Sequence, residues 1–365
     1  MKRILTIFLP LVFLPPVGGA ATIPMDSQRG DRLFETQGCI QCHKLKGQGG
    51  TTAPDLGRVL DRAYTPAELA GAMWNHAPAM WGTIQQKGVK VGELDQQTAA
   101  DLFASFYSAR YFEMPGDAAR GKRLFTEKSC TNCHGLNTSP NNQAKPVNQW
   151  QSITDPVAMV GAMWNHSPAM WNELSKKKLA SPSLTAQDLS DLLVYLRNAS
   201  PAMRSAPQTF RITAGDDGAK LFESKGCLAC HKSQQFSVMT LTGVAAAMWN
   251  HAAFLHLEPP RLNTDEMREV LSYSWAKPFF ESNGDAAKGK RVFASKHCAD
   301  CHSGSGPGPL LTDKAGSWNG ITMVSALWRH GPSMLSEMKQ KKIPWPVFRA
   351  GEMPDLIAFI NEKSK

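Results

Sequence analysis

The chain has 365 residues and a formal net charge of +9. Beyond its N-terminal segment, no stretch approaches the roughly 18 uninterrupted apolar residues of a membrane-spanning helix, which excludes a transmembrane segment in the mature chain. The basic balance favours partners with acidic surfaces, and nucleic acid is the other class of partner that such a charge would attract.

The N-terminus has the three parts of a secretory signal peptide. Met1, Lys2 and Arg3 give a charged start, residues 4–14 are mostly apolar, and small residues occupy 18–21. This order predicts a signal peptide over residues 1–21, cleaved after Ala20 or Ala21. The mature protein is therefore expected in the periplasm, with an extracellular location as the alternative. That compartment argues against nucleic acid, so we expect redox proteins with acidic surfaces as partners.

A pattern of two cysteines followed at once by histidine occurs four times and uses every cysteine of the chain. C-x-x-C-H is typical of covalent haem attachment, with two thioether bonds and a proximal histidine on the iron. The sequence thus predicts four covalently bound haem c groups. The cysteines are Cys39 and Cys42, Cys130 and Cys133, Cys227 and Cys230, and Cys298 and Cys301, and the proximal histidines are His43, His134, His231 and His302.

Zinc ribbons and redox disulfides also use paired cysteines. Neither chemistry requires a histidine directly after every second cysteine, so both fit the pattern less well than haem does.

Each motif lies between similar flanking segments, which makes the chain a fourfold repeat. A glycine stands nine residues before the first cysteine of every motif, inside a short segment expected to be helical: Gly30, Gly121, Gly218 and Gly289. After each motif comes a second predicted helix, and then a third with apolar residues spaced i, i+3, i+4, i+7. Thr185 with Asp188 resembles a capping pair at the start of one third helix.

The second helix carries two candidates for the sixth iron ligand, one helical turn apart. The histidines are His76, His166, His251 and His330, and the methionines are Met80, Met170 and Met334. A proline follows the histidine in three repeats, at Pro78, Pro168 and Pro332. Proline breaks a helix interior, so the chain is expected to kink there and start a new helix.

This order of elements resembles class I cytochrome c. The resemblance implies an all-α protein with four tandem haem domains after the signal peptide. The expected domains are residues 26–113, 114–206, 207–282 and 283–365. It also implies that a proline carbonyl in the loop after each motif accepts a hydrogen bond from the proximal histidine, with Pro54, Pro146 and Pro309 as matches.

The sixth ligand stays open between histidine and methionine. Class I cytochromes usually use methionine, in a stretch that residues 75–80 resemble. The histidine, however, occurs in all four repeats, whereas repeat 3 has Leu255 in place of methionine. Two histidine ligands would give lower potentials than histidine with methionine.

Repeat 3 (207–282) departs from the others. It lacks the loop proline and the methionine, and only 20 residues separate His231 from His251, against 33 from His43 to His76. We therefore expect its haem to have a distinct potential or a weak or absent sixth ligand, with ordinary ligation by His251 as the alternative.

No nucleophile motif, phosphate loop or dinucleotide fingerprint is present, so one-electron transfer at iron is the available chemistry. The expected function is a tetrahaem carrier that relays electrons between a membrane-associated or periplasmic donor and an acceptor protein. Alternatives are a cytochrome subunit of a larger oxidoreductase and a haem enzyme whose catalytic domain is domain 3. The sequence predicts no oligomeric state.

Overall fold

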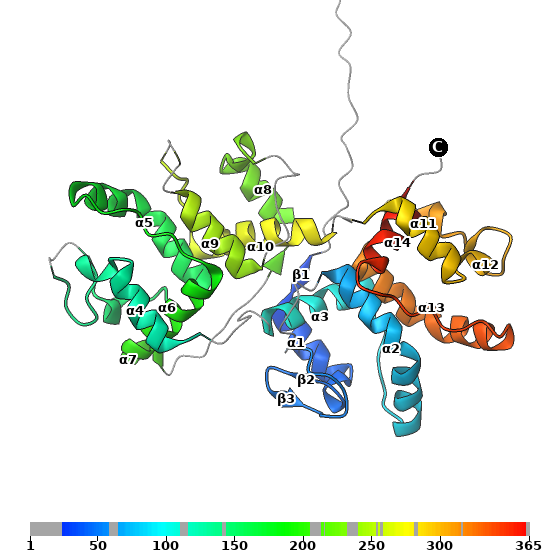
Figure 1. The fold of residues 1–365 in the computed structure, drawn as a ribbon. Helices are drawn as coiled ribbons and strands as arrows, with labels where there is room; N and C mark the ends of the chain where they lie inside the picture. Colours follow the sequence, from blue (N-terminus) through cyan, green and yellow to red (C-terminus); the bar gives the residue numbers. More distant parts are fainter. Residues whose placement is uncertain are drawn as a thin grey trace, which may run out of the picture.

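The chain is mostly helical in a computed structural model (Figure 1). The structure describes residues 24–57, 65–109, 116–140, 144–204, 213–214, 216–231, 240–252, 255, 258–280, 284–314 and 317–362. The predicted signal peptide and the predicted domain boundaries at 113/114, 206/207 and 282/283 lie outside the described residues. Within the described part, no helix is both long and apolar enough to cross a bilayer.

The helices follow the same order in each sequence repeat. The first helices are α1 (Ser27–Thr36), α4 (Ala118–Glu127), α8 (Asp216–Ser224) and α11 (Ala286–Ser295). The cysteines lie at the short turns η1 (Cys39–Gln41), η2 (Cys130–Asn132) and η4 (Cys227–Ala229), and at α12 (Ala299–His302). The second helices are α2 (Pro66–Lys87), α5 (Pro156–Lys176), α9 (Leu241–Ala252) and α13 (Gly320–Gln340). The third helices are α3 (Gln96–Ala109), α6 (Ala186–Ala199), α10 (Thr264–Phe280) and α14 (Glu352–Asn361).

The remaining elements are short. They are η3 (Val147–Gln149), η5 (Leu311–Lys314), α7 (Pro201–Arg204), and the strands β1 (Met25–Asp26), β2 (Lys44–Leu45), β3 (Gln48–Gly49) and β4 (Thr213–Ala214). β2 and β3 form an antiparallel hairpin within repeat 1, and β1 pairs with β4 of repeat 3. The fold class predicted from the sequence, all-α, is confirmed.

The repeated glycine marks the place where the first and third helices of a repeat cross. A Cβ atom on Gly30 would lie 2.0 Å from the backbone oxygen of Asp101 in α3. The same closeness recurs at Gly121 and Gly289, where a Cβ would lie 2.1 and 2.0 Å from a backbone oxygen. Only glycine lets the two backbones approach so closely.

An aspartate of the third helix holds the chain where the first helix begins. The backbone amide of Asp26 donates to the Asp101 carboxylate at 2.7 Å. The same bond, also 2.7 Å long, joins Asp117 to Asp191 and Asp285 to Asp355. Since Asp26, Asp117 and Asp285 are the N-cap residues of α1, α4 and α11, the bond ties each helix start to its crossing partner.

Helix starts follow from local chemistry. At α5, Pro156 occupies the first turn and the Asp155 side chain accepts from the Ala158 amide at 3.0 Å. At α6, Thr185 and Asp188 form a reciprocal capping box, which confirms the capping pair expected from the sequence.

The expected break at the internal prolines is wrong. Each proline lies inside a continuous second helix: Pro78 in α2, Pro168 in α5 and Pro332 in α13. A proline removes the amide that would bind the carbonyl four residues earlier, and in two helices that carbonyl has another donor. The Trp74 carbonyl accepts from the Trp345 indole at 2.8 Å, and the Trp164 carbonyl accepts from the Ser167 hydroxyl at 2.7 Å.

The repeats are not arranged in space in chain order. In Figure 1, the helices of repeats 2 and 3, green to yellow, form one lobe, and those of repeats 1 and 4, blue and orange to red, form the other. α2 packs against α13 in one lobe, and α5 packs against α9 and α10 in the other. The β1–β4 pairing, with Met25 opposite Ala214, joins the lobes through repeats 1 and 3.

Candidate haem sites

The C-x-x-C-H segment has one backbone geometry in all four repeats. The histidine amide donates to the carbonyl of the first cysteine over 3.0, 2.9, 2.8 and 2.9 Å in repeats 1 to 4. The residue before the first cysteine has a positive φ, and it is glycine at 38 and 226 and a side-chain-bearing residue at 129 and 297. The tight turn brings both cysteines and the histidine of each motif together.

All eight cysteines are free of disulfides. Burial raises the pKa of Cys39, Cys130 and Cys298 to about 11, so each carries its proton at neutral pH. No group of three or more histidine, cysteine or acidic side chains suited to a metal ion occurs among the described residues. The described part of the chain therefore lacks the four-ligand set that a structural zinc site needs.

Backbone carbonyls orient the proximal candidates His43, His134 and His302. Nδ1 of His43 lies 2.8 Å from the Pro54 oxygen, and Nδ1 of His302 lies 2.9 Å from the Pro309 oxygen. Both proline carbonyls were expected from the sequence and are confirmed. Donation from Nδ1 leaves Nε2 free to bind a metal.

Repeat 2 differs from that expectation. Nδ1 of His134 lies 3.4 Å from the carbonyl oxygen of Lys145, not of Pro146. The Lys145 oxygen also accepts from the Trp150 indole at 2.9 Å, and the Trp150 ring packs edge-on against His134. The indole thus holds this carbonyl toward the histidine, which shifts the acceptor by one residue.

Burial lowers the pKa of His43, His134 and His231. Each imidazole is therefore neutral at pH 7, which is the form that binds a metal.

The distal candidates His76, His166 and His251 are oriented in the same way, by the carbonyl one turn earlier in their own helix. Nδ1 lies 2.6 Å from the Ala72 oxygen for His76, 2.5 Å from the Ala162 oxygen for His166, and 3.2 Å from the Ala247 oxygen for His251. As in His43 and His302, Nε2 is the nitrogen left free.

In three repeats the two histidines of a repeat face each other. Their ring centres are 6.4 Å apart for His43 and His76, 6.2 Å for His134 and His166, and 5.6 Å for His231 and His251. An imidazole centre lies about 1.2 Å from its nitrogen and a metal–imidazole bond is about 2 Å, so two end-on ligands of one metal have ring centres about 6.4 Å apart. The separations in repeats 1 and 2 therefore fit an iron between the rings, and the separation in repeat 3 is about 0.8 Å shorter than this value.

Repeat 2 also has a cavity in which the porphyrin of a haem could lie. It measures about 530 Å³ and is lined by the two cysteines of the motif and by His134, His166 and Met170. This volume lies in the range of cofactor pockets. The methionine alternative thus shares the cavity with the histidine, but it is the histidine ring that faces His134.

Fewer contacts define the positions of the remaining sixth-ligand candidates, Met80, Met334 and His330. Met80 and Met334 are half-buried on the same helices as their histidines. In repeat 4, where both His302 and His330 are described, no ring contact joins the two. Repeat 4 rather than repeat 3 therefore departs from the facing geometry.

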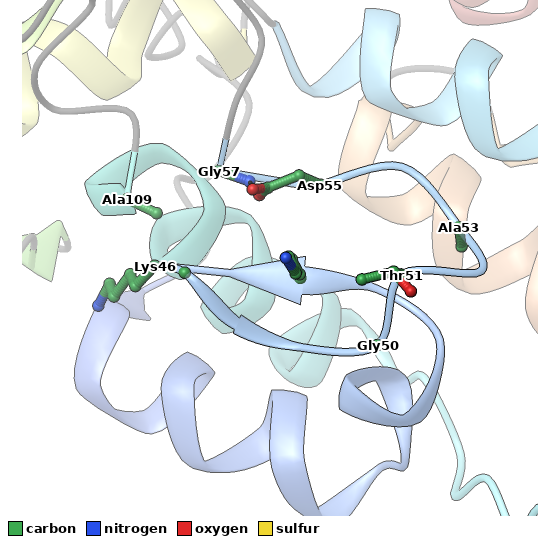
Figure 2. A pocket seen from close by; sticks show the side chains of 9 residues that line it. Lys46, Gly50, Thr51, Ala53, Asp55, Gly57 and Ala109 are labelled. Atoms are coloured by element: carbon green, nitrogen blue, oxygen red, sulfur yellow. Dashed lines mark hydrogen bonds between the residues drawn. The ribbon is translucent and has the colours of Figure 1, made fainter.

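Repeat 1 has a hollow of about 570 Å³, lined by residues of the loop that follows its C-x-x-C-H motif and by Ala109 (Figure 2). No cysteine or histidine lines it. Lys46 on its rim pairs with Asp31 at 2.6 Å, and the Asp55 carboxylate accepts from the Gly57 amide at 2.9 Å. Because its lining holds no cysteine or histidine, this hollow is not where the C-x-x-C-H motif would bind haem.

The role of the two residues before each distal histidine was not predicted from the sequence. Trp164 and Asn165, and likewise Trp249 and Asn250, bind backbone groups of another repeat. Their recurrence beside the histidine was the available signal, but the sequence alone does not say which surface they contact.

Two stretches of the chain, residues 27–104 and 118–200, match the family model described as Cytochrome c. Each stretch runs from the first helix of its repeat to the third and contains one C-x-x-C-H motif with its facing histidine. Repeats 3 and 4 lie outside the two stretches. No curated protein and no solved structure matches the chain. The two matches support a c-type cytochrome with covalently bound haem c, and hence a role in electron transfer.

Proposed function

We propose that the chain is an exported tetrahaem c-type cytochrome that relays single electrons between a membrane-associated or periplasmic donor and an acceptor protein. The observation that carries this proposal is the paired histidine geometry beside a C-x-x-C turn, seen in repeats 1, 2 and 3. Repeat 3 lies outside the family matches yet has the same arrangement. Repeat 4 shares the C-x-x-C-H turn and the carbonyl behind its proximal histidine.

The residues that would hold each group follow from the motif. The cysteine pairs at 39 and 42, 130 and 133, 227 and 230, and 298 and 301 would form the thioether bonds, and His43, His134, His231 and His302 would bind the iron on one side. The haem supplies reversible one-electron chemistry when bound. Backbone carbonyls orient six of these histidines through Nδ1, which are His43, His134, His302, His76, His166 and His251.

For the second axial position we propose His76, His166 and His251 in repeats 1 to 3. Nε2 is free in each, and each ring faces its proximal partner. In repeat 4 the choice between His330 and Met334 stays open, because no ring contact favours the histidine.

The same observation favours a carrier over a haem enzyme. Catalysis at domain 3 would need an open coordination position. In repeat 3 the His251 ring lies opposite His231, with ring centres 5.6 Å apart, so a candidate sixth ligand stands beside the proximal histidine in this repeat too.

The haem count is tested by intact-mass spectrometry of the full chain, produced in cells that mature cytochromes c. We expect four covalent haem additions and an N-terminus close to residue 22. Replacing Cys130 and Cys133 together with alanine should remove one addition and leave three. A wild-type mass with fewer than four additions would contradict the tetrahaem proposal.

The ligand assignment is tested in repeat 2, where both candidates line one cavity. His166→Ala should convert one haem to the high-spin form in the visible spectrum, while the matched variant Met170→Leu should leave all haems low-spin. Leucine is a natural control, since repeat 3 has Leu255 at the equivalent position. The opposite result would assign methionine.

Electron transfer is tested by reduction kinetics. We expect the oxidised protein to take up four electrons from a small reductant and to pass them to an oxidised acceptor protein. Release of product from peroxide or a nitrogen oxyanion at catalytic rates would instead indicate an enzyme.

A further inference from the structure

The tryptophan–asparagine pair before the distal histidine binds a neighbouring repeat. The Trp164 indole donates to the Pro260 carbonyl at 2.8 Å, and the Asn165 side chain bonds both the amide and the carbonyl of Leu262. The Leu262 amide donates to Asn165 Oδ1 over 3.0 Å. Repeat 2 thus makes hydrogen bonds to the segment that leads into α10 of repeat 3.

Repeat 3 makes equivalent hydrogen bonds to repeat 2. The Trp249 indole donates to the Pro182 carbonyl at 2.9 Å. Asn250 bonds the carbonyl and the amide of Leu184, both over 2.8 Å. The two sets of bonds are reciprocal, as in a two-fold symmetric interface.

A related interface joins repeats 1 and 4. Asn75 bonds the carbonyl and the amide of Phe348 over 2.8 and 2.7 Å, and the Trp328 indole donates to the Gly92 carbonyl at 3.3 Å. Arg329 stands where the other repeats have asparagine, so only one side of this interface has the amide clamp.

The interface reaches the haem-facing residues themselves. The Trp164 ring of repeat 2 packs against His251 of repeat 3, with ring centres 6.2 Å apart. His251 directly follows Asn250, which holds repeat 2, and His166 directly follows Asn165, which holds repeat 3. Movement of one repeat against the other would therefore move the distal histidine of each.

The two pairs of repeats meet through repeats 1 and 3. Besides the β1–β4 pairing, the Tyr107 hydroxyl accepts from the Leu241 amide at 3.0 Å, and the Tyr107 and Trp275 ring centres are 4.1 Å apart. The repeats thus contact one another in the order 2–3–1–4, although they follow one another as 1–2–3–4 in the chain.

From these contacts we infer that the tryptophan–asparagine pairs are interdomain positioning residues, which couple domain 2 with domain 3 and domain 1 with domain 4. This inference rests on the proposed function. With haem bound in each domain, a single electron would pass from a reduced to an oxidised haem, and no bond would form or break. Electrons would move along the spatial order 2–3–1–4, with the atypical domain 3 in the interior of the relay.

The test compares two variants of the full haem-loaded protein. The double variant Asn165→Ala, Asn250→Ala removes the amide clamp between domains 2 and 3. Asn75→Ala is the matched control, because it removes the same clamp between domains 1 and 4. The single variant Asn165→Ala serves if the double variant does not fold.

The first readout is amide hydrogen exchange, which does not depend on electron transfer. In the double variant, exchange should accelerate about tenfold at Leu184 and Leu262, because each amide loses its acceptor, and stay unchanged at Phe348. Asn75→Ala should give the reverse pattern. Unchanged exchange at Leu184 and Leu262 in the double variant would overturn the clamp.

The second readout is a redox titration followed by spectra. Charges on neighbouring haems interact, so loosening one interface should change the midpoint potentials of the two haems beside it. The double variant should therefore shift two of the four potentials and leave the other two unchanged. Asn75→Ala should shift the two potentials that the double variant leaves unchanged. Accelerated exchange with all four potentials unchanged would overturn the coupling. If mass spectrometry finds fewer than four haems, the proposed tetrahaem function is contradicted. Hydrogen exchange at Leu184 and Leu262 still tests the asparagine contacts in that case.

Discussion

Replacing Gly30 with alanine tests whether the crossing of α1 and α3 depends on glycine. The added Cβ would lie 2.0 Å from the Asp101 oxygen and 2.7 Å from the Ser105 Cβ. The oxygen belongs to helix backbone and cannot rotate away, so the helices must separate by about 1 Å or more to restore normal contact. Overpacking typically costs about 1–3 kcal/mol, and alanine returns about 1 kcal/mol in helix propensity. Because the clash is with backbone, we expect a net loss of about 2 kcal/mol.

Gly82→Ala is the matched control. Gly82 also lies within a helix, α2, but nothing lies within 4 Å of its added Cβ. Only the propensity gain applies, so stability should rise by up to about 1 kcal/mol.

Differential scanning calorimetry with far-ultraviolet circular dichroism is the assay, since a chain of several domains need not unfold in one step. For a domain of repeat 1's size, a loss of about 2 kcal/mol lowers the melting temperature by roughly 8 °C or more. If Gly30→Ala melts at or above the wild-type temperature, the glycine is not required for the crossing.

Three further changes have expected outcomes. Thr185→Ala removes the capping box of α6 and should cost about 1 kcal/mol in denaturant unfolding, and an unchanged midpoint would argue against the cap. Arg268→Ala removes the ion pair that Arg268 makes at 3.1 Å with Asp155, which is 3% exposed, and this should cost about 3 kcal/mol by the same measurement. No loss would show that the pair is dispensable. Burial raises the pKa of Asp188, but hydrogen bonds from Thr185 and the charge of Arg120 lower it overall. The stability that Asp188→Asn removes should therefore be present above the ordinary aspartate pKa of about 3.9, and it should disappear as the pH falls through the pKa of Asp188 in the folded protein. A difference in denaturation midpoint that does not change with pH would contradict this.

Features set by neighbours in sequence were predictable. The helix order and the capping box of Thr185 follow from residues a few positions apart. The carbonyls behind His43 and His302 were expected from the resemblance to class I cytochrome c. The expected helix break at Pro78 failed because the carbonyl it frees is bound by Trp345, which lies 271 residues from Trp74. The acceptor at Lys145 was missed although the Trp150 indole that holds this carbonyl lies close in the sequence, because the resemblance pointed to the carbonyl of Pro146.

The sequence by itself determined the covalent chemistry, because C-x-x-C-H depends only on the spacing within one turn. It also determined which histidines and methionines share a helix face, because that follows from helix periodicity. The tertiary structure decided that His76, His166 and His251 face their proximal partners, and that the repeats pair as 2 with 3 and 1 with 4. Those arrangements depend on contacts between residues far apart in the chain, such as Asn165 with Leu262, and no local spacing specifies them.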